Sequence, residues 1–348
     1  MADGTDAGGS ELKAVFGPVP SRRLGRSLGI DPIPSKTCNW NCVYCQLGRT
    51  GRLVTERREW VPEGLILGQL REALDRHGPG EIDWVTFVGS GEPTLHSGLG
   101  RMIRAVKGMT AIPVAVITDG SLLFRPELRE ELLAADAVLP SLDAGNEDLY
   151  RKINRPHGSL DFARHVEGLV AFRREYRGRY WLEVMLLDGV NDDEESLRDL
   201  AACVRRIRPD AVHLDIPSRP PAEPWVRPAT EEGLMRASAI LGGLATVVHP
   251  VEGTFDLGGY EDVLDAVVGI ITRHPMRQDQ LERSLARWSA GEVREALEKL
   301  RADGRATVVE RLGARFWSAA GARYGRPAAA RGRRQRRGSA AERNGGER

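Results

Sequence analysis

Three closely spaced cysteines are the residues of this sequence with the most evident chemistry. Cys38, Cys42 and Cys45 follow the spacing Cys-x3-Cys-x2-Cys, and an aromatic residue, Tyr44, stands directly before the last of them. Three thiolates this close in sequence can bind three irons of a [4Fe-4S] cluster. The fourth iron would then be open to a ligand that is not part of the protein. The spacing therefore predicts a cluster with a reactive iron.

A zinc knuckle, a disulfide framework and surface thiols are the alternative interpretations of this triplet. Structural zinc usually has four ligands, arranged as two separated pairs of Cys or His. The only other cysteine, Cys203, lies far downstream, and the nearest histidine, His77, is isolated. Three cysteines also do not form the even set of a small secreted scaffold. The cluster is therefore the favoured interpretation.

The composition agrees with an intracellular enzyme. The chain has 348 residues, a formal net charge of +1 and 41% hydrophobic residues, which allows a large domain and a small one. No apolar run approaches the roughly 20 residues that cross a bilayer. Residues 1–13 are polar and glycine-rich, so we expect a disordered N-terminus rather than a signal peptide. These features predict a cytoplasmic protein that does not interact with membranes.

The segment from residue 14 to residue 251 has the pattern of an α/β protein. Short β-rich runs alternate with helical patterns, such as the apolar positions Leu67, Leu70 and Leu74, and this alternation is typical of βα units in a parallel sheet. Six βα units would form an incomplete (β/α)6 barrel with its active site at the carboxyl ends of the strands. The expected strands are residues 27–33, 84–88, 114–118, 137–141, 181–187 and 211–216.

The pattern changes in residues 252–325. Residues 261–272, 277–286 and 290–302 are predicted helices, and two short β-prone runs follow, 306–310 and 314–318. Three helices and a β-hairpin predict a small winged-helix domain, which could bind nucleic acid, peptide or another protein domain.

The C-terminal tail, residues 326–348, contains eight arginines and two glutamates and has no apolar periodicity. We expect it to be disordered. A solvated extension is favoured over a phosphate-binding arm, because a run of charge has no specificity by itself.

Several predicted strands end in polar residues. After the strand 84–88, Gly91 would let the backbone approach a ligand, and Glu92 could accept from an ammonium group. An ordinary βα loop is the alternative. The other polar residues at strand ends are Thr118 and Asp119, Ser141 and Asp143, Asp188 and Asn191, and His213 and Asp215, although a histidine at a strand end is more often structural.

An arginine-rich segment precedes the cysteines. Arg22, Arg23 and Arg26 lie among Pro and Gly residues. Guanidinium groups pair with phosphate and carboxylate in a bidentate manner, so these arginines could bind an anionic substrate. Solvated loop charges are an equally good interpretation.

These motifs together resemble a known group of proteins. The segments 21–29, 44–48, 90–94, 141–144 and 150–156, together with the cysteine triplet, resemble the radical S-adenosylmethionine (SAM) superfamily, and within it a group related to wyosine-type tRNA-modifying enzymes. The resemblance covers about residues 14 to 250. It implies two cofactors, a [4Fe-4S] cluster bound by Cys38, Cys42 and Cys45, and SAM.

The same resemblance implies roles for the SAM-binding residues. Tyr44 would lie beside the adenine, and Gly91 and Glu92 would hold the methionyl amine. Ser141 and Asp143 would contact ribose and carboxylate, and Asn191 would reach SAM or the substrate. No catalytic residue is assigned. The wyosine enzyme uses a second cluster with three further cysteines, and Cys203 alone cannot hold one.

The resemblance favours an enzyme that cleaves SAM reductively and abstracts hydrogen from a substrate, most plausibly RNA in a tRNA modification. It implies a low-potential electron donor of the flavodoxin or ferredoxin type. One alternative is a radical SAM enzyme that modifies a peptide or protein. Another is a non-catalytic redox sensor in which a winged helix binds nucleic acid.

Overall fold

The structure is a computed structural model, and it describes residues 12–249 and 260–325. Three expectations fall wholly or largely outside these ranges. They are the disordered N-terminus 1–13, of which only residues 12 and 13 are described, the domain boundary at residues 251 and 252, and the disordered tail 326–348.

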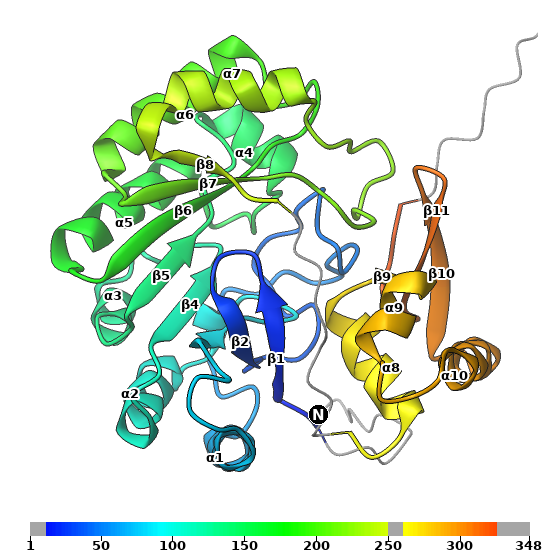
Figure 1. Cartoon of the computed structure of the whole chain (residues 1–348). Coiled ribbons are helices and arrows are strands. Elements are labelled where there is room, and N and C mark those ends of the chain that lie inside the picture. Colours follow the sequence, from blue (N-terminus) through cyan, green and yellow to red (C-terminus); the bar gives the residue numbers. More distant parts are fainter. Residues whose placement is uncertain (1–11, 250–259, 326–348) are drawn as a thin grey trace, which may run out of the picture.

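An eight-stranded sheet forms the larger unit (Figure 1), with the strands in sequence order from β1 to β8. β1 is antiparallel to β2, and all later neighbours are parallel. The strands are β1 (Val15–Ser21), β2 (Gly25–Ile30), β3 (Trp84–Phe87), β4 (Val114–Thr118), β5 (Ala137–Pro140), β6 (Arg179–Met185), β7 (Ala211–Asp215) and β8 (Ala245–Val247).

The six predicted strands are confirmed as β2 to β7, and the α/β class with a partial barrel is correct. Two strands of this sheet, β1 and β8, were not predicted. β1 contains Pro18 and Pro20, which suit an edge strand but weaken the sequence pattern of a strand. β8 has three residues, too few for a pattern.

Helices lie along the outside of this sheet (Figure 1). They are α1 (Glu63–Arg76), α2 (Leu99–Met109), α3 (Pro126–Leu132), α4 (Glu147–Ile153), α5 (Phe162–Glu175), α6 (Glu194–Ile207) and α7 (Glu231–Leu241), with short 3-10 turns at Pro93–Leu95 and Gly242–Leu244. Side-chain caps begin several of them, for example Asn146 on α4 and Asp161 on α5. Their apolar faces and the strands share one core, in which Leu28, Phe87 and Leu182 are fully buried.

The turn between β1 and β2 enters the interior of the barrel. Leu24 packs there with Trp84, Leu139 and other inward-facing side chains. The neighbouring Arg23 forms ion pairs with Glu183 on β6 at 2.6 Å and with Asp215 on β7 at 2.7 Å. The β1–β2 hairpin, at one edge of the sheet, is therefore bound to β6 and β7, which lie near the other edge.

A second unit follows with its own core. It consists of α8 (Val263–Arg273), β9 (Met276–Arg277), α9 (Gln278–Ser284), α10 (Ala290–Ala302), β10 (Ala306–Arg311) and β11 (Ala314–Ala319). The strands form a sheet in the order β10-β11-β9. Leu281, Leu297 and Trp317 are among the residues that fill its core. The predicted helices and hairpin are present, and the assignment as a winged helix stays a prediction.

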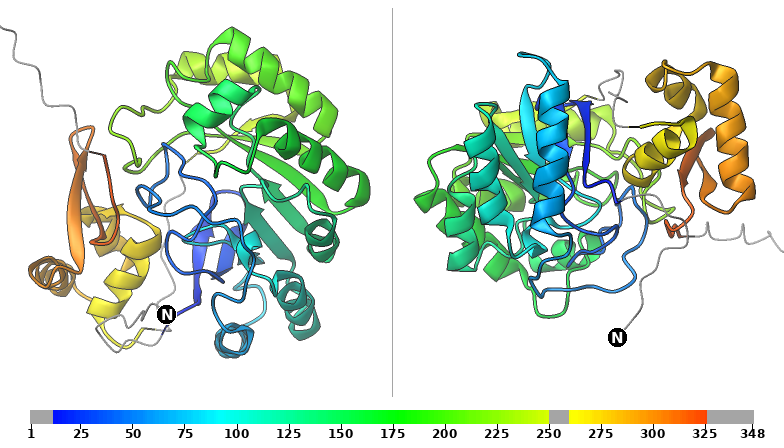
Figure 2. Two further views of the ribbon diagram at one scale, coloured as in Figure 1. Left: turned by 180° about the vertical axis from the view of Figure 1, so that it is seen from behind. Right: turned by 90° about the horizontal axis from the view of Figure 1, so that it is seen from below.

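The C-terminal unit is tied to the first unit by polar contacts, and Figure 2 shows the two side by side. The Arg273 side chain pairs with the buried Asp31 at 3.2 Å. The Arg273 carbonyl accepts a hydrogen bond from Gln46, and the Gln46 carbonyl accepts one from Tyr324. The backbone nitrogen of Arg49 donates to the carbonyl of Arg323 at 2.6 Å. Gln46 and Arg49 follow the third cysteine, so this unit contacts the candidate site.

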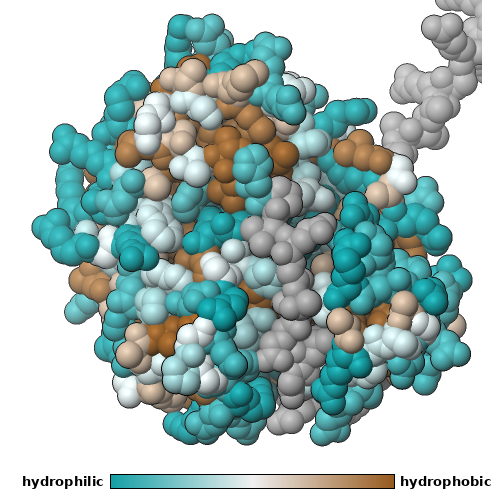
Figure 3. All heavy atoms as spheres, in the orientation of Figure 1, coloured by the Kyte–Doolittle hydropathy of each residue, from teal (hydrophilic) through white to brown (hydrophobic). Residues whose placement is uncertain are grey.

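The surface is mostly hydrophilic on the face drawn in Figure 3, and apolar atoms gather mainly over α7 and β8. In the described part of the chain, no helix is both long enough and apolar enough to span a bilayer.

We predict that Arg273→Ala lowers the free energy of unfolding by about 3 to 5 kcal/mol, because it leaves the buried Asp31 carboxylate without its ionic partner. Arg294→Ala is the matched control, since Arg294 forms a surface pair with Glu282 and should cost at most about 1 kcal/mol. Urea denaturation of the full chain measures both. Equal losses in the two variants would contradict this account of the Arg273–Asp31 pair.

Candidate active site

The three cysteines lie on one loop at the carboxyl end of β2. We call residues 36–50 the cluster loop. In the left view of Figure 2, the blue segment that follows β2 crosses in front of the barrel. Cys38, Cys42 and Cys45 are half-buried free thiols, and the Cys45 nitrogen donates to the Cys42 carbonyl at 3.2 Å. The loop thus turns tightly between the second and third cysteines.

The end of α4 supports the cluster loop from one side. The backbone nitrogens of Asn41 and Val43 donate to the carbonyls of Asn154 and Ile153 at 3.0 and 2.9 Å. The Asn41 side chain in turn accepts from the Thr50 nitrogen at 2.8 Å. These contacts give the loop a defined backbone.

Donors surround the thiols. The Trp40 nitrogen lies 3.4 Å from Cys38 Sγ, and Asn154 Nδ2 lies 3.8 Å from Cys42 Sγ. Lys36 Nζ lies 3.2 Å from Cys45 Sγ and also donates to the Gly48 carbonyl at 2.7 Å. Such donors stabilise thiolate sulfur. Sequence reasoning missed Lys36, although its position two residues before Cys38 was a usable signal.

Burial raises the pKa values of the Cys38 and Cys42 thiols well above their usual range. The Asp119 carboxylate adds to the rise at Cys38, and Cys45 adds to it at Cys42. A metal must therefore displace protons from these sulfurs when it binds.

The glycine-rich loop packs directly on the cluster loop. The Lys36 nitrogen donates to the Ser90 carbonyl at 2.6 Å, and the Glu92 nitrogen donates to the Thr37 carbonyl at 2.9 Å. A Cβ atom on Gly91 would lie 1.9 Å from the Thr37 oxygen. The close approach that Gly91 permits is therefore an approach to the backbone beside Cys38.

Glu92 is buried and hydrogen-bonded to its own surroundings. Its Oε1 accepts from the Thr94 nitrogen at 2.9 Å and from Thr118 Oγ1 at 2.6 Å, and its Oε2 accepts from the Asp119 nitrogen at 2.7 Å. Burial raises its pKa. The carboxylate thus joins the glycine-rich loop to the end of β4, and its predicted contact with an ammonium group stays a prediction.

Asp119 has a carboxylate oxygen without a partner. Its Oδ1 accepts from the Ser121 nitrogen at 2.9 Å, whereas its Oδ2 is buried and has no hydrogen bond within the described part of the chain. Burial, followed by the charge of Glu92, raises its pKa well above the usual range. A positive group at Oδ2 would keep this carboxylate ionised. The sequence marked Asp119 only as a polar residue at a strand end.

Tyr44, Asp143 and Asn191 lie together in the structure, and their roles toward SAM stay predictions. Tyr44 Oη donates to Asp143 Oδ2 at 2.6 Å, and the Met185 nitrogen donates to Asp143 Oδ1 at 2.8 Å. Asn191 Nδ2 donates to the Asp143 carbonyl at 2.8 Å. Ser141 joins this region through its backbone, which pairs with Glu183 and with the Thr118 carbonyl. These bonds orient the phenol ring beside the cysteines.

Other candidates lie elsewhere. Asp188 is exposed. His213 faces the interior of the barrel, where burial and then Arg23 lower its pKa to about 4. Asp215 pairs with Arg22 and Arg23, so these two arginines already have a carboxylate partner. Arg26 pairs with Asp83 at the surface. The predicted arginine-rich anion site is therefore largely neutralised.

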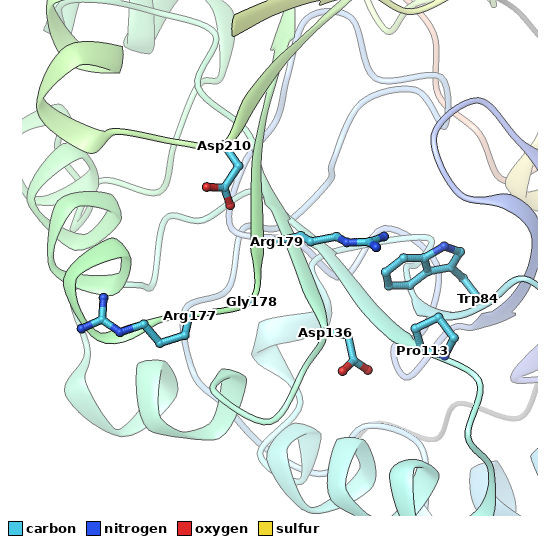
Figure 4. A pocket seen from close by; sticks show the side chains of 7 residues that line it. All are labelled: Trp84, Pro113, Asp136, Arg177, Gly178, Arg179 and Asp210. Atoms are coloured by element: carbon cyan, nitrogen blue, oxygen red, sulfur yellow. The ribbon is translucent and has the colours of Figure 1, made fainter.

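A cavity of about 460 Å³ lies at the opposite end of the barrel (Figure 4). Its lining comes from the amino ends of the strands and the segments before them, and consists of Trp84, Pro113, Asp136, Arg177, Gly178, Arg179 and Asp210. The cysteine loop follows the carboxyl end of β2, so this cavity is not part of the candidate site.

Within residues 12–249 and 260–325, no three His, Cys, Asp or Glu side chains form a group that could hold one metal ion. In a cubic cluster each thiolate binds a different iron, so the ligands do not have to converge on a single point. The half-buried thiols, their donors and the unpartnered Asp119 oxygen fit a cluster with a cationic ligand beside it.

Comparison with known proteins identifies the class. A family model described as the radical SAM superfamily matches residues 33–201, which include all three cysteines. A radical SAM methyltransferase from Sphaerobacter thermophilus has the same fold, with a TM-score of 0.50 and 22% sequence identity over 64% of this chain and 66% of that one. The chain is thus a radical SAM enzyme, and its cofactors are a [4Fe-4S] cluster and SAM.

Similar sequences show the family within this class. A UPF0026 protein of Methanocaldococcus jannaschii is 36% identical over 279 residues, which cover 79% of this chain and 86% of that protein. The chain belongs to the UPF0026 family. A ribosomal RNA large subunit methyltransferase N of Nitrosopumilus maritimus is 28% identical over 232 residues, 62% of each chain.

Another relative, named GTPase Obg, from Brachyspira hyodysenteriae, is 46% identical over 227 residues. These residues cover 65% of this chain but 33% of that protein, so the chain spans about a third of its length. The present sequence contains no Gly-x4-Gly-Lys-Ser/Thr phosphate-binding motif. The GTPase activity in that name is therefore not transferred.

We predict that Cys38→Ala, Cys42→Ala and Cys45→Ala each abolish the cluster, because each removes one of three thiolate ligands. Cys203→Ala should retain it, since Cys203 is buried on α6 with its Sγ 3.7 Å from the Gly145 carbonyl. Iron and sulfide quantification after anaerobic reconstitution, with about four irons expected per wild-type chain, measures this. Loss of iron in Cys203→Ala would refute the three-cysteine site.

We also predict that Gly91→Ala reduces bound iron and lowers the free energy of unfolding by at least about 1 to 3 kcal/mol, because the new methyl group would clash with the Thr37 carbonyl. Gly68→Ala is the matched control. Gly68 lies inside α1 with open space at its Cβ position, and the change should stabilise the chain by about 0.5 to 1 kcal/mol. Iron content and urea denaturation report both effects. Full iron content in Gly91→Ala would show that the loops can separate.

Proposed function

We propose that this enzyme modifies RNA by hydrogen abstraction that begins with reductive cleavage of SAM. The observation that carries the proposal is that three thiols lie at the carboxyl end of the barrel together with a carboxylate oxygen of Asp119 that has no partner among the described residues. When bound, the cluster and SAM supply an electron and a 5'-deoxyadenosyl radical. A redox sensor would need the thiols but not the carboxylate.

Each residue of the site has a distinct task in this proposal. Cys38, Cys42 and Cys45 would hold three irons. Asp119 Oδ2 would accept a hydrogen bond from the SAM ammonium group, since it is the buried acceptor whose charge acts on Cys38. Glu92 would position Asp119 through the hydrogen bond from the Asp119 nitrogen. In this assignment, Asp119 and not Glu92 contacts the amine of SAM.

Tyr44 and Asp143 would shape the adenosine side of the site. The hydrogen bond between them holds the phenol ring, so the ring face is presented in one orientation. Asn191 fixes Asp143 by donating to its carbonyl. Ser141 would border the same region from the end of β5.

RNA is supported as the substrate by the similarity to proteins named as RNA methyltransferases. Besides the archaeal relative, a dual-specificity RNA methyltransferase RlmN of Lawsonia intracellularis is 26% identical over 227 residues. The one cysteine outside the triplet, Cys203, lies buried on α6 and has no role in the proposal. A peptide substrate is the alternative outcome of the tests.

The central test is the formation of 5'-deoxyadenosine and methionine from SAM by the reduced, anaerobically reconstituted chain. We expect turnover with dithionite or a flavodoxin-type donor, and a faster rate with bulk tRNA or ribosomal RNA than without it. No 5'-deoxyadenosine under any of these conditions would refute the proposal. Stimulation by peptides but not RNA would refute its RNA part.

We predict that Asp119→Asn retains iron and weakens SAM binding by about tenfold to a hundredfold, because it removes a charge-assisted hydrogen bond of about 1.5 to 3 kcal/mol. Asp75→Asn is the control, since Asp75 is exposed on α1. Calorimetric titration of the reconstituted protein with SAM measures both affinities. An unchanged affinity in Asp119→Asn would remove Asp119 from the site.

A further inference from the structure

Arg219 occupies the junction between the cluster loop and the C-terminal unit. It belongs to the loop that follows β7, and Figure 1 shows this loop extending toward the C-terminal unit. Its Nη1 lies 3.0 Å from Gln46 Oε1 and 3.2 Å from His274 Nδ1. Gln46 directly follows Cys45. The guanidinium is therefore held close to the third cluster ligand.

The guanidinium of Arg219 is half-buried and has no ion pair with a carboxylate among the described residues. Burial, followed by the charge of Arg22, lowers its pKa to about 10. His274 does not compensate the charge, because burial and the surrounding arginines lower its pKa well below the usual range and keep the ring neutral. A partly desolvated cation without a counter-ion is unfavourable, and binding of an anion would remove this cost.

Arg22 adds positive charge next to Arg219. Its Nη2 donates to Ser218 Oγ at 2.6 Å, and its Nη1 pairs with Asp215 Oδ1 at 3.1 Å. Asp215 is shared, because its other oxygen pairs with Arg23 at 2.7 Å. Arg23 also pairs with Glu183 at 2.6 Å, so two carboxylates serve these two guanidinium groups. Among the described residues, Arg219 is the third guanidinium here and has no carboxylate of its own. The local charge favours an anion.

We propose that Arg219, together with Arg22, binds a phosphate group of the RNA substrate at the junction of the β7 loop, the cluster loop and the C-terminal unit. This proposal rests on the proposed function and adds where the substrate is held. The planar guanidinium fork matches two phosphate oxygens, and phosphodiesters recur along RNA. The position beside Gln46 would place the neighbouring nucleotide near the cluster.

The carboxylate of SAM is the competing anion. The residues proposed for SAM, Asp119 and Asp143, follow β4 and β5, whereas Arg219 follows β7 and contacts α8 through His274. The site at Arg219 is therefore assigned to the substrate, and the experiment includes a SAM titration to separate the two anions.

The test compares wild type, R219Q and the control R104Q, each as reconstituted full-length protein. Arg104 is an exposed arginine on α2 and carries the same charge. Binding of bulk tRNA is measured over a range of chloride concentrations. We expect R219Q to bind tRNA about tenfold more weakly, with a log–log salt slope smaller in magnitude by about 0.7 to 0.9, and R104Q to match wild type. Inorganic phosphate should compete better than chloride of equal ionic strength in wild type and not in R219Q.

Three results would overturn the proposal. They are equal tRNA binding by R219Q and R104Q, no tRNA binding by wild type at low salt, and weakened SAM binding in R219Q with unchanged tRNA binding, which would assign the anion to SAM. If R219Q loses iron, R22Q is the second variant with the same expectations, since Arg23 still neutralises Asp215. Formation of 5'-deoxyadenosine without RNA is scored separately. If R219Q forms 5'-deoxyadenosine and binds tRNA as wild type does, only the phosphate site at Arg219 is rejected. If wild type forms no 5'-deoxyadenosine, the proposed function is rejected.

Discussion

The active site depends on the backbone contact between the cluster loop and the glycine-rich loop. Two hydrogen bonds, from Lys36 to Ser90 and from Glu92 to Thr37, bring the loops together, and they require a residue without Cβ at position 91. Through this contact, Glu92 sets the distance between the first cysteine and the end of β4. A displacement here would separate the thiols from the carboxylate at Asp119, so one backbone contact holds the three cysteines and Asp119 in register.

The C-terminal unit contributes to this same arrangement. Asp31 accepts from Ser90 of the glycine-rich loop and from Arg273 of α8, so a single buried carboxylate links the two units. Tyr324 and Arg323 bind the backbone just after Cys45. The sequence divides the chain into a catalytic part and an accessory part, yet these contacts mean that a change in the C-terminal unit would reach the cluster loop. The position of this unit and the backbone of the cluster loop are thereby coupled.

Buried arginines illustrate why charge alone does not identify a binding site. The arginine-rich segment before the cysteines looked suited to an anion, but Arg23 pairs with Glu183 and Asp215 inside the barrel and serves to attach the β1–β2 hairpin. Arg219 had no motif around it. Its importance comes from what surrounds it, a neutral histidine and an amide instead of a carboxylate. In the proposal for Arg219, the lack of a carboxylate partner among the described residues, and not the presence of an arginine, points to an anion site.

The sequence by itself determined the features that are local. Alternating β-rich and helical runs predicted β2 to β7, and the spacing of three cysteines predicted the cluster, because both patterns lie within short stretches of chain. Only the tertiary structure decided which polar groups lack partners. Glu92 accepts hydrogen bonds from Thr118 and Asp119, which are 26 and 27 positions away along the chain. Arg23 pairs with Asp215, which is 192 positions away. Hydrogen-bond partners at such separations are set by how the strands align in the sheet, and a sequence pattern of a few residues does not contain that information.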